Sequence, residues 1–255
     1  MNVYGTEQIR NVVLLGHGGA GKTTVAEAMA LITGVTKRMG KVADGNTISD
    51  YDKEEIKRQF SISTTLIPLE YQGENGPVKI NLLDTPGFFD FVGEVEEAIS
   101  VADAAIIVVN CKAGIEPGTE RAWEMCEKYN LPRMFFVTEM DLDHVSYRKV
   151  VEDLTELYGK KIAPIHMPIR ENEQFVGYVN IVKQAGRRYV ERGQKKECPV
   201  PDYLEEYLEK YHDILMESVA EISEEFMERY FAGEEFSVAE VSAALKMNIS
   251  DGSII

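Results

Sequence analysis

The sequence predicts an α/β fold, in which a doubly wound, mostly parallel sheet carries an inserted α+β subdomain. Short apolar runs rich in branched aliphatic residues alternate with helix-like segments as far as Tyr158. Strands that are apolar throughout and separated by helices are typical of a parallel sheet covered on both faces. A glycine-rich loop also joins the first apolar run to the first helix, which is typical of this class.

The first elements are a strand and a helix, followed by a hairpin. Asn11–Gly16 (NVVLLG) is a compact apolar run, and Lys22–Leu31 has a helical composition. Phe60–Tyr71 and Val78–Asp84 are β-rich runs on either side of Gln72–Pro77 (QGENGP). The Asn-Gly step in this linker favours a tight turn, so we expect an antiparallel pair.

Two further strands complete the predicted sheet. Ala104–Asn110 (AAIIVVN) and Arg133–Thr138 (RMFFVT) are apolar runs on either side of a helix-like segment, Thr119–Tyr129. A helix is expected next over Tyr147–Tyr158. In such a sheet, ligands bind at the carboxyl ends of the strands.

The composition changes after Tyr158, and we expect two domains, 1–158 and 159–255. Ala163–Ile169 and Gln174–Asn180 are predicted to be short strands. A polar, basic stretch follows at Gly186–Glu197.

The last quarter of the chain is predicted to be helical. Gly233 is expected to end one helix, and Ser237 with Glu240 forms a capping-box signature for a final helix through Met247. The first of these helices is expected to turn one apolar face to the core, formed by Leu215, Val219, Ile222, Phe226 and Tyr230.

The chain is acidic, with a formal net charge of −16. Because phosphate backbones are held by clustered Lys and Arg, this charge argues against a broad nucleic-acid surface. The glutamates of the last quarter are interpreted as a solvated helix face, with a docking face for a partner as the alternative. They are Glu205, Glu206, Glu209, Glu217, Glu221, Glu224, Glu225 and Glu228.

Nothing in the sequence indicates a membrane or secretory protein. No apolar run is long enough to span a bilayer, and Met1–Arg10 does not have the pattern of a signal peptide. We expect a soluble, cytoplasmic protein without a membrane partner. Cys111, Cys126 and Cys198 lack metal-binding or paired spacing, and we expect reduced, mostly buried thiols.

The glycine-rich loop GHGGAGKT satisfies the phosphate-binding pattern G-x-x-x-x-G-K-[ST] between a strand and a helix. Glycines let successive N–H groups turn inward around phosphates, and the helix N-terminus adds positive potential. Lys22 is expected to reach the β- and γ-phosphates, and the Thr23 hydroxyl to ligate Mg²⁺. The predicted nucleotide contacts here are Gly16, His17, Gly18, Gly19, Ala20, Gly21, Lys22, Thr23 and Thr24.

A second motif, DTPG at Asp84–Gly87, closes a predicted strand. Asp84 is expected to be the carboxylate partner of Mg²⁺, and Gly87 to offer its N–H to the γ-phosphate. The alternative is an ordinary turn. Ser61 is the best candidate for a further hydroxyl ligand, although alone it would be a strand serine.

Asp141 follows the predicted strand that ends at Thr138, in the segment TEMD. A carboxylate at this position can accept from N1–H and the exocyclic amino group of guanine, which adenine does not offer in the same place. A helix N-cap aspartate is the alternative interpretation. We assign Thr138 and Asp141 to the predicted base site.

With these motifs in this order, the sequence resembles the translational GTPases, and within them elongation factor G or a close paralogue. The resemblance covers nearly the whole chain, and rests on VKINLLDTPGFFDFVGEVEEA, on LPRMFFVTEMD and on His212–Leu245. It implies a GTP/GDP switch with Mg²⁺ in which Lys22, Ser61 and Gly87 are the catalytic groups. It also implies the ribosome as partner, including its stalk, which would contact the inserted subdomain.

The sequence departs from the family pattern at several positions. Gly18-Gly19 replaces an Ile-Asp pair, so a hydrophobic gate residue and a loop carboxylate are absent. Ser61 replaces the switch threonine, and Phe88 replaces the histidine that positions the attacking water. The guanine motif Asn-Lys-x-Asp is reduced to its aspartate, Asp141.

The family's last guanine-contacting strand and Ser-Ala turn would follow Ile255, so we expect an N-terminal fragment of a longer protein. Phe88 and Glu139 predict slow hydrolysis, or a paralogue that binds nucleotide without hydrolysing it. A ribosome protection protein of the tetracycline-resistance type shares the domain plan and is a further alternative.

Overall fold

The computed structural model describes residues 3–73, 76–190 and 194–251. The chain divides into two compact units, Met1–Thr138 and Glu139–Ile255. The sequence predicts a boundary between residues 158 and 159, whereas in the structure the segment from Glu139 to Tyr158 belongs to the second unit. Its contacts explain this, since Tyr147 Oη donates to the carbonyl of His166, 2.8 Å away.

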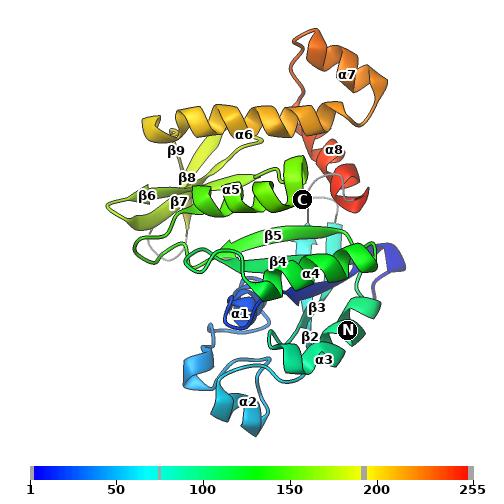
Figure 1. Ribbon diagram of the computed structural model, residues 1–255, viewed down its shortest axis with the longest axis vertical. Helices are drawn as coiled ribbons and strands as arrows, with labels where there is room; N and C mark the ends of the chain where they lie inside the picture. The colour runs from blue at the N-terminus through cyan, green and yellow to red at the C-terminus, as the bar shows by residue number, and fades with distance from the viewer. Residues whose placement is uncertain (1–2, 74–75, 191–193, 252–255) are drawn as a thin grey trace. The chain divides into compact units, whose positions relative to one another are not determined.

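The first unit contains a five-stranded sheet, as predicted (Figure 1). Its strands in spatial order are β2 (Thr65–Gly73), β3 (Gly76–Asp84), β1 (Ile9–Leu15), β4 (Ala104–Asn110) and β5 (Arg133–Thr138). β2 pairs antiparallel with β3, and every other pairing is parallel. The doubly wound, mostly parallel α/β fold is therefore confirmed. Glu74 and Asn75 of the predicted turn lie outside the described residues.

The described part of this unit contains the helices α1 (Lys22–Ile32), α2 (Lys53–Arg58), α3 (Val92–Ser100) and α4 (Pro117–Lys128), of which α1, α3 and α4 pack on the sheet. Short 3₁₀ turns lie at Thr6–Gln8, Val42–Asp44 and Phe89–Phe91. From β1 the chain crosses through α1 to β3 on one side, and later crosses through α3 and α4 toward β4 and β5. Right-handed crossovers then place α1 on one face of the sheet and α3 and α4 on the other.

The core beneath α1 shows why these residues form these elements. Val25, Ala26 and Ala30 of α1 are buried against Leu14 of β1 and Leu82 of β3. Parallel register pairs Leu14 with Asp84, so the carboxyl ends of β1 and β3 lie side by side. The loops that follow these two strands therefore start from one edge of the sheet.

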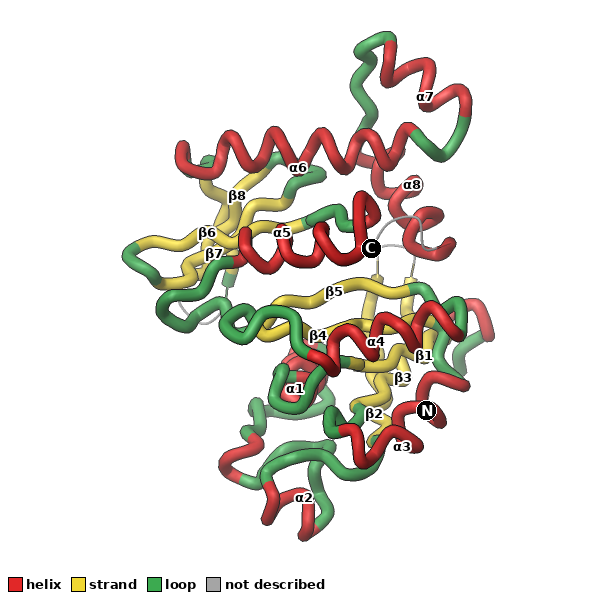
Figure 2. Tube along the Cα trace, in the orientation of Figure 1, coloured by secondary structure: helices red, strands yellow, loops and turns green. Residues whose placement is uncertain are grey.

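The second unit combines helices with an antiparallel sheet, as an α+β subdomain should. α5 (Tyr147–Tyr158) and a 3₁₀ turn (Gly159–Lys161) lead into β6 (His166–Glu171), β7 (Gln174–Asn180), β8 (Ala185–Tyr189) and β9 (Lys195–Cys198), which pair in that order. Figure 2 shows these strands in yellow beside the long red helix α6. β8 and β9 fall in the stretch that the sequence identifies only as polar and basic.

The helical region of the second unit differs from the prediction. The sequence predicts the apolar stripe on one helix, but the stripe is divided between α6 (Asp202–Ala220) and α7 (Glu224–Phe231). Ser223 caps α7, because its hydroxyl accepts from the N–H of Phe226 at 3.2 Å. Leu215 and Val219 are fully buried, whereas the ring of Phe226 instead stacks on Phe236 at 5.1 Å.

The remaining predictions for this region hold. Gly233 follows α7 with a left-handed φ of 74°. Ser237 and Glu240 form the predicted capping box at the start of α8 (Val238–Asp251), which continues past Met247. The eight glutamates of the predicted solvated face are all exposed. Cys111 and Cys126 are buried, and Cys198 is partly exposed. No described helix is long and apolar enough to cross a membrane.

Candidate functional site

The loop between β1 and α1 is shaped by glycines with positive φ values. Gly16, Gly19 and Gly21 have φ values of 135°, 84° and 95°, which L side chains rarely adopt. A Cβ on Gly16 would also collide with the carbonyl oxygen of Val108 in β4. The loop therefore passes close over the sheet edge before α1 begins at Lys22.

Lys22 is the first residue of α1, and its side chain is buried inside this loop. Its ammonium donates to the carbonyl oxygens of Gly16, at 3.0 Å, and His17, at 2.8 Å. Burial lowers the pKa of Lys22 to about 8, and the nearby carboxylates of Asp84 and Glu116 oppose that shift. The ammonium is therefore partly desolvated, so an anion placed beside it would be strongly stabilised.

Asp84 ends β3 and is 1% exposed. Among the described residues, no hydrogen bond reaches either of its carboxylate oxygens. Burial raises the pKa of Asp84 to about 6, although Ser49 and Thr23 lie close enough to lower it in part. A buried carboxylate without a partner is costly, and a metal ion or its bound water would satisfy it.

Ser61 lies beside Thr23. Their hydroxyl oxygens are 3.3 Å apart, and Ser61 also donates to Asp50 Oδ1 at 2.7 Å. Asp50 is buried, burial raises its pKa, and its Oδ2 has no hydrogen bond from the described residues. The structure thus groups the hydroxyls of Thr23 and Ser61 with two buried carboxylates.

Two buried glutamates fix the segment that carries Asp50 and Ser61. Glu27 of α1, 1% exposed, accepts from the N–H of Gly40 at 2.6 Å and of Ile48 at 2.5 Å. Glu55 accepts from the N–H of Ile62 at 3.0 Å. Sequence reasoning missed Asp50, Glu27 and Glu55, because isolated carboxylates in helices and loops usually face solvent.

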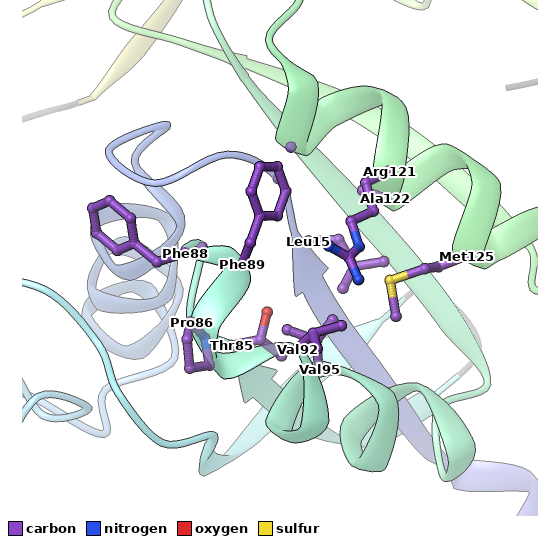
Figure 3. A pocket seen from close by; sticks show the side chains of 13 residues that line it. Leu15, Thr85, Pro86, Phe88, Phe89, Val92, Val95, Arg121, Ala122 and Met125 are labelled. Atoms are coloured by element: carbon purple, nitrogen blue, oxygen red, sulfur yellow. The ribbon is translucent and has the colours of Figure 1, made fainter.

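Gly87 and Phe88 lie against the glycine-rich loop. A Cβ on Gly87 would contact Lys22 Nζ and would lie 2.7 Å from the Cα of Gly18, so only glycine fits there. Phe88 is 42% exposed, so it is not a core residue. Figure 3 shows Phe88 and Phe89 pointing in different directions from the loop.

A small pocket lies between the DTPG loop, α3 and α4, and Gly16, Gly87, Phe88 and Phe89 are among the residues that line it (Figure 3). His17 connects this region to the glycine-rich loop. Its Nδ1 accepts from the N–H of Gly118 at 3.2 Å, and its ring meets Phe89 edge-on at 6.2 Å. His17 therefore connects the loop to the start of α4. This structural role is additional to the predicted contact of His17 with the nucleotide.

The other predicted contacts have different environments. Thr138 at the end of β5 donates to the carbonyl of Ala20 at 2.7 Å, so its hydroxyl supports the loop. Ala20 is buried, and Thr24 is exposed in the first turn of α1. Asp141 belongs to the second unit, so its role toward a guanine base stays a prediction.

Asp84→Asn is expected to stabilise the protein in the absence of Mg²⁺ at neutral pH. The folded state holds the Asp84 proton more tightly, so this contribution to stability is complete below pH 3.8 and is lost as pH rises through about 6. A pKa raised from 3.8 to about 6 corresponds to about 3 kcal/mol. Asparagine does not ionise and avoids this loss.

Urea unfolding in EDTA at pH 5 and pH 7.5 measures this effect. The advantage of Asp84→Asn over the parent protein should grow with pH, whereas Asp90→Asn, at an exposed site in the same loop, should change little. An advantage that stays constant or shrinks between the two pH values would contradict the buried, unpartnered carboxylate.

Comparison with known proteins agrees with this geometry. A family model described as the elongation factor Tu GTP binding domain matches residues 7–251. The chain also resembles a crystal structure of a protein from Thermus thermophilus, with a TM-score of 0.89 and 36% sequence identity. The match covers 97% of this chain and 36% of that protein, so the chain spans about a third of its length.

Proposed function

The chain belongs to the family of the elongation factor Tu GTP-binding domain, and from that premise we propose that it is the Mg²⁺-dependent GTP/GDP switch of an elongation-factor-G-like protein acting on the ribosome. The observation that carries the proposal is Asp84. This buried carboxylate lacks a hydrogen-bond partner among the described residues, and lies beside Lys22 and Thr23 at the end of the glycine-rich loop.

The residues present fit Mg²⁺. Hard cations prefer oxygen ligands, and the hydroxyls of Thr23 and Ser61 with the carboxylate of Asp84 would hold it. When bound, Mg²⁺ would supply positive charge that neutralises part of the charge of the phosphates. Lys22 and the loop amides, including Gly87 N–H, would orient the phosphates. The described residues contain no cluster of three or more His, Cys, Asp or Glu, so phosphate oxygens would supply the remaining ligands.

We expect weak selectivity for guanine over adenine. Glu139 stands where the family has a lysine that covers the base, and the hydroxyl of Thr138 is already engaged by Ala20. Asp141 is left as the main discriminator, and each lost polar contact is worth about 1–3 kcal/mol. Competition between GDP and ADP for the Mg²⁺-loaded protein measures the preference. Sub-micromolar GDP binding with adenine excluded about a thousandfold would contradict this expectation.

The ribosome, with its stalk contacting the second unit, is the proposed partner in the cytoplasm. Hydrolysis of GTP measured with and without ribosomes tests this part of the proposal, because a switch that acts there should be stimulated. A second candidate function is a nucleotide-binding module that scarcely hydrolyses GTP. Phe88 favours it, since a phenyl ring can neither donate a hydrogen bond to the attacking water nor accept one.

A further inference from the structure

The ring of Phe88 touches parts of the first unit that are distant in sequence. Its centroid lies 4.7 Å from that of Phe60, with the planes at 59°, which is ordinary aromatic packing. The ring edge also points at Gly18, where an added Cβ would lie 3.1 Å from Cζ and 3.2 Å from Cε1 and Cε2. Phe88 thus joins the DTPG loop to the glycine-rich loop and to the segment around Phe60.

Gly18 differs from the other glycines of its loop. Its φ lies outside the left-handed region, so its backbone does not require glycine. By contrast, Gly19 has a φ of 84° and open space where a Cβ would stand. The reason for glycine at position 18 is therefore steric. The Phe88 ring lies in tight contact with the place where a Cβ at position 18 would stand.

Phe60 links this contact to the predicted metal site. It directly precedes Ser61, whose hydroxyl donates to Asp50 and lies 3.3 Å from that of Thr23. Phe60 also lies 6.3 Å from Phe91, so two rings of the segment after DTPG hold it. Phe88 is therefore in contact, through Phe60, with the segment that carries Ser61.

We propose that Gly18, Phe60 and Phe88 form an aromatic latch that holds the segment carrying Ser61 and the loop carrying Gly87 together on the glycine-rich loop. The inference rests on the proposed function and assigns Phe88 a positioning role within it. A γ-phosphate would engage both latched segments, because Gly87 N–H would donate to it and Ser61 would help to hold the Mg²⁺ that accompanies it, whereas GDP has no such group. The latch therefore favours GTP over GDP.

The test is the ratio of the affinities for GTPγS and GDP, measured with Mg²⁺. An aromatic contact of this kind corresponds to a factor of about 2 to 10 in affinity. Phe60→Ala and Phe88→Ala should each lower the ratio by that factor, and the double variant should lower it little further, because either change opens the latch. Phe89→Ala is the matched control, since its ring packs on His17 and not on Phe60.

Two further variants separate the latch from a general loss of packing. Gly18→Ala should lower the ratio by pushing the ring away, and adding it to Phe88→Ala should bring no further loss. Trypsin gives a second readout, because Lys57 and Arg58 are exposed on α2 just before Phe60. GTPγS should slow cleavage there in the parent protein and fail to do so in Phe88→Ala.

The outcomes distinguish the latch from the function on which it rests. If the parent protein binds both nucleotides and the ratio stays unchanged in Phe88→Ala and Gly18→Ala, the latch is wrong and the nucleotide switch stands. If the folded parent protein binds neither nucleotide, both are wrong. Because Phe88 is exposed at the surface, its variants should fold. They therefore test the latch even if Phe60→Ala fails to fold.

Discussion

Replacing Lys22 by alanine is expected to weaken the binding of Mg²⁺ and GTP or GDP at least about tenfold. The ammonium is buried and held by the carbonyls of Gly16 and His17, so it is positioned for phosphate before the nucleotide arrives. A charge-assisted hydrogen bond of this kind is worth roughly 1.5–3 kcal/mol. Calorimetric titration of both proteins measures the change.

The pH dependence of binding provides an independent check on Lys22. Its pKa is lowered to about 8, so in the free protein the ammonium loses its proton as pH rises above that value. Phosphate favours the protonated form, and affinity should therefore fall above pH 8, by up to about tenfold per pH unit. Lys22→Ala should lack this dependence, and Lys57→Ala, on the exposed surface of α2, should retain it. Equal affinities for Lys22→Ala and the parent protein would refute the assignment.

Hydrolysis of GTP is expected to be very slow, and Phe88→His to accelerate it on ribosomes. A positioned acid–base group typically contributes roughly 10²- to 10⁴-fold to the rate, and a phenyl ring supplies none of this. Imidazole is smaller than phenyl, so a histidine fits against Gly18 without a clash. The expected contacts of Lys22 and the loop amides with phosphate are the same in both proteins. The two proteins should therefore bind nucleotide with similar affinity although they hydrolyse GTP at different rates.

Single-turnover hydrolysis with and without ribosomes measures this effect. Phe89→His serves as the control, because it places an imidazole in the same loop but on the side of the pocket lined by α3 and α4. The slow-switch account fails if the parent protein already hydrolyses GTP rapidly on ribosomes and the histidine at position 88 adds nothing.

The first unit could be predicted closely from the sequence because local signals and tertiary packing agree there. β4 and β5 have the predicted bounds, since strands buried on both faces are uniformly apolar and end sharply at polar residues. The glycine-rich loop and DTPG also identify their own positions, because their backbone geometry admits few other residues. Ser61 became a candidate metal ligand only through the family resemblance, and its contact with Thr23 is seen only in the structure.

The remaining features depend on contacts between distant parts of the chain. α6 and α7 share one apolar period, and only the cap at Ser223 separates them. β8 and β9 carry basic residues on a half-exposed antiparallel sheet, which weakens the pattern of alternation. Asp50 and Glu27 are buried by tertiary packing, which local sequence does not reveal. For the same reason, the contact between Phe88 and Gly18 could not be foreseen.

The most direct test of the central account is equilibrium binding of a fluorescent GDP or GTP to the folded protein, with Mg²⁺ and again with EDTA. We expect saturable binding with Mg²⁺ and a marked loss of affinity in EDTA, because Thr23, Ser61 and Asp84 are proposed to hold the metal. We also expect that unlabelled GDP displaces the probe. Failure of the folded protein to bind either nucleotide, even at millimolar concentration with Mg²⁺, would contradict the account.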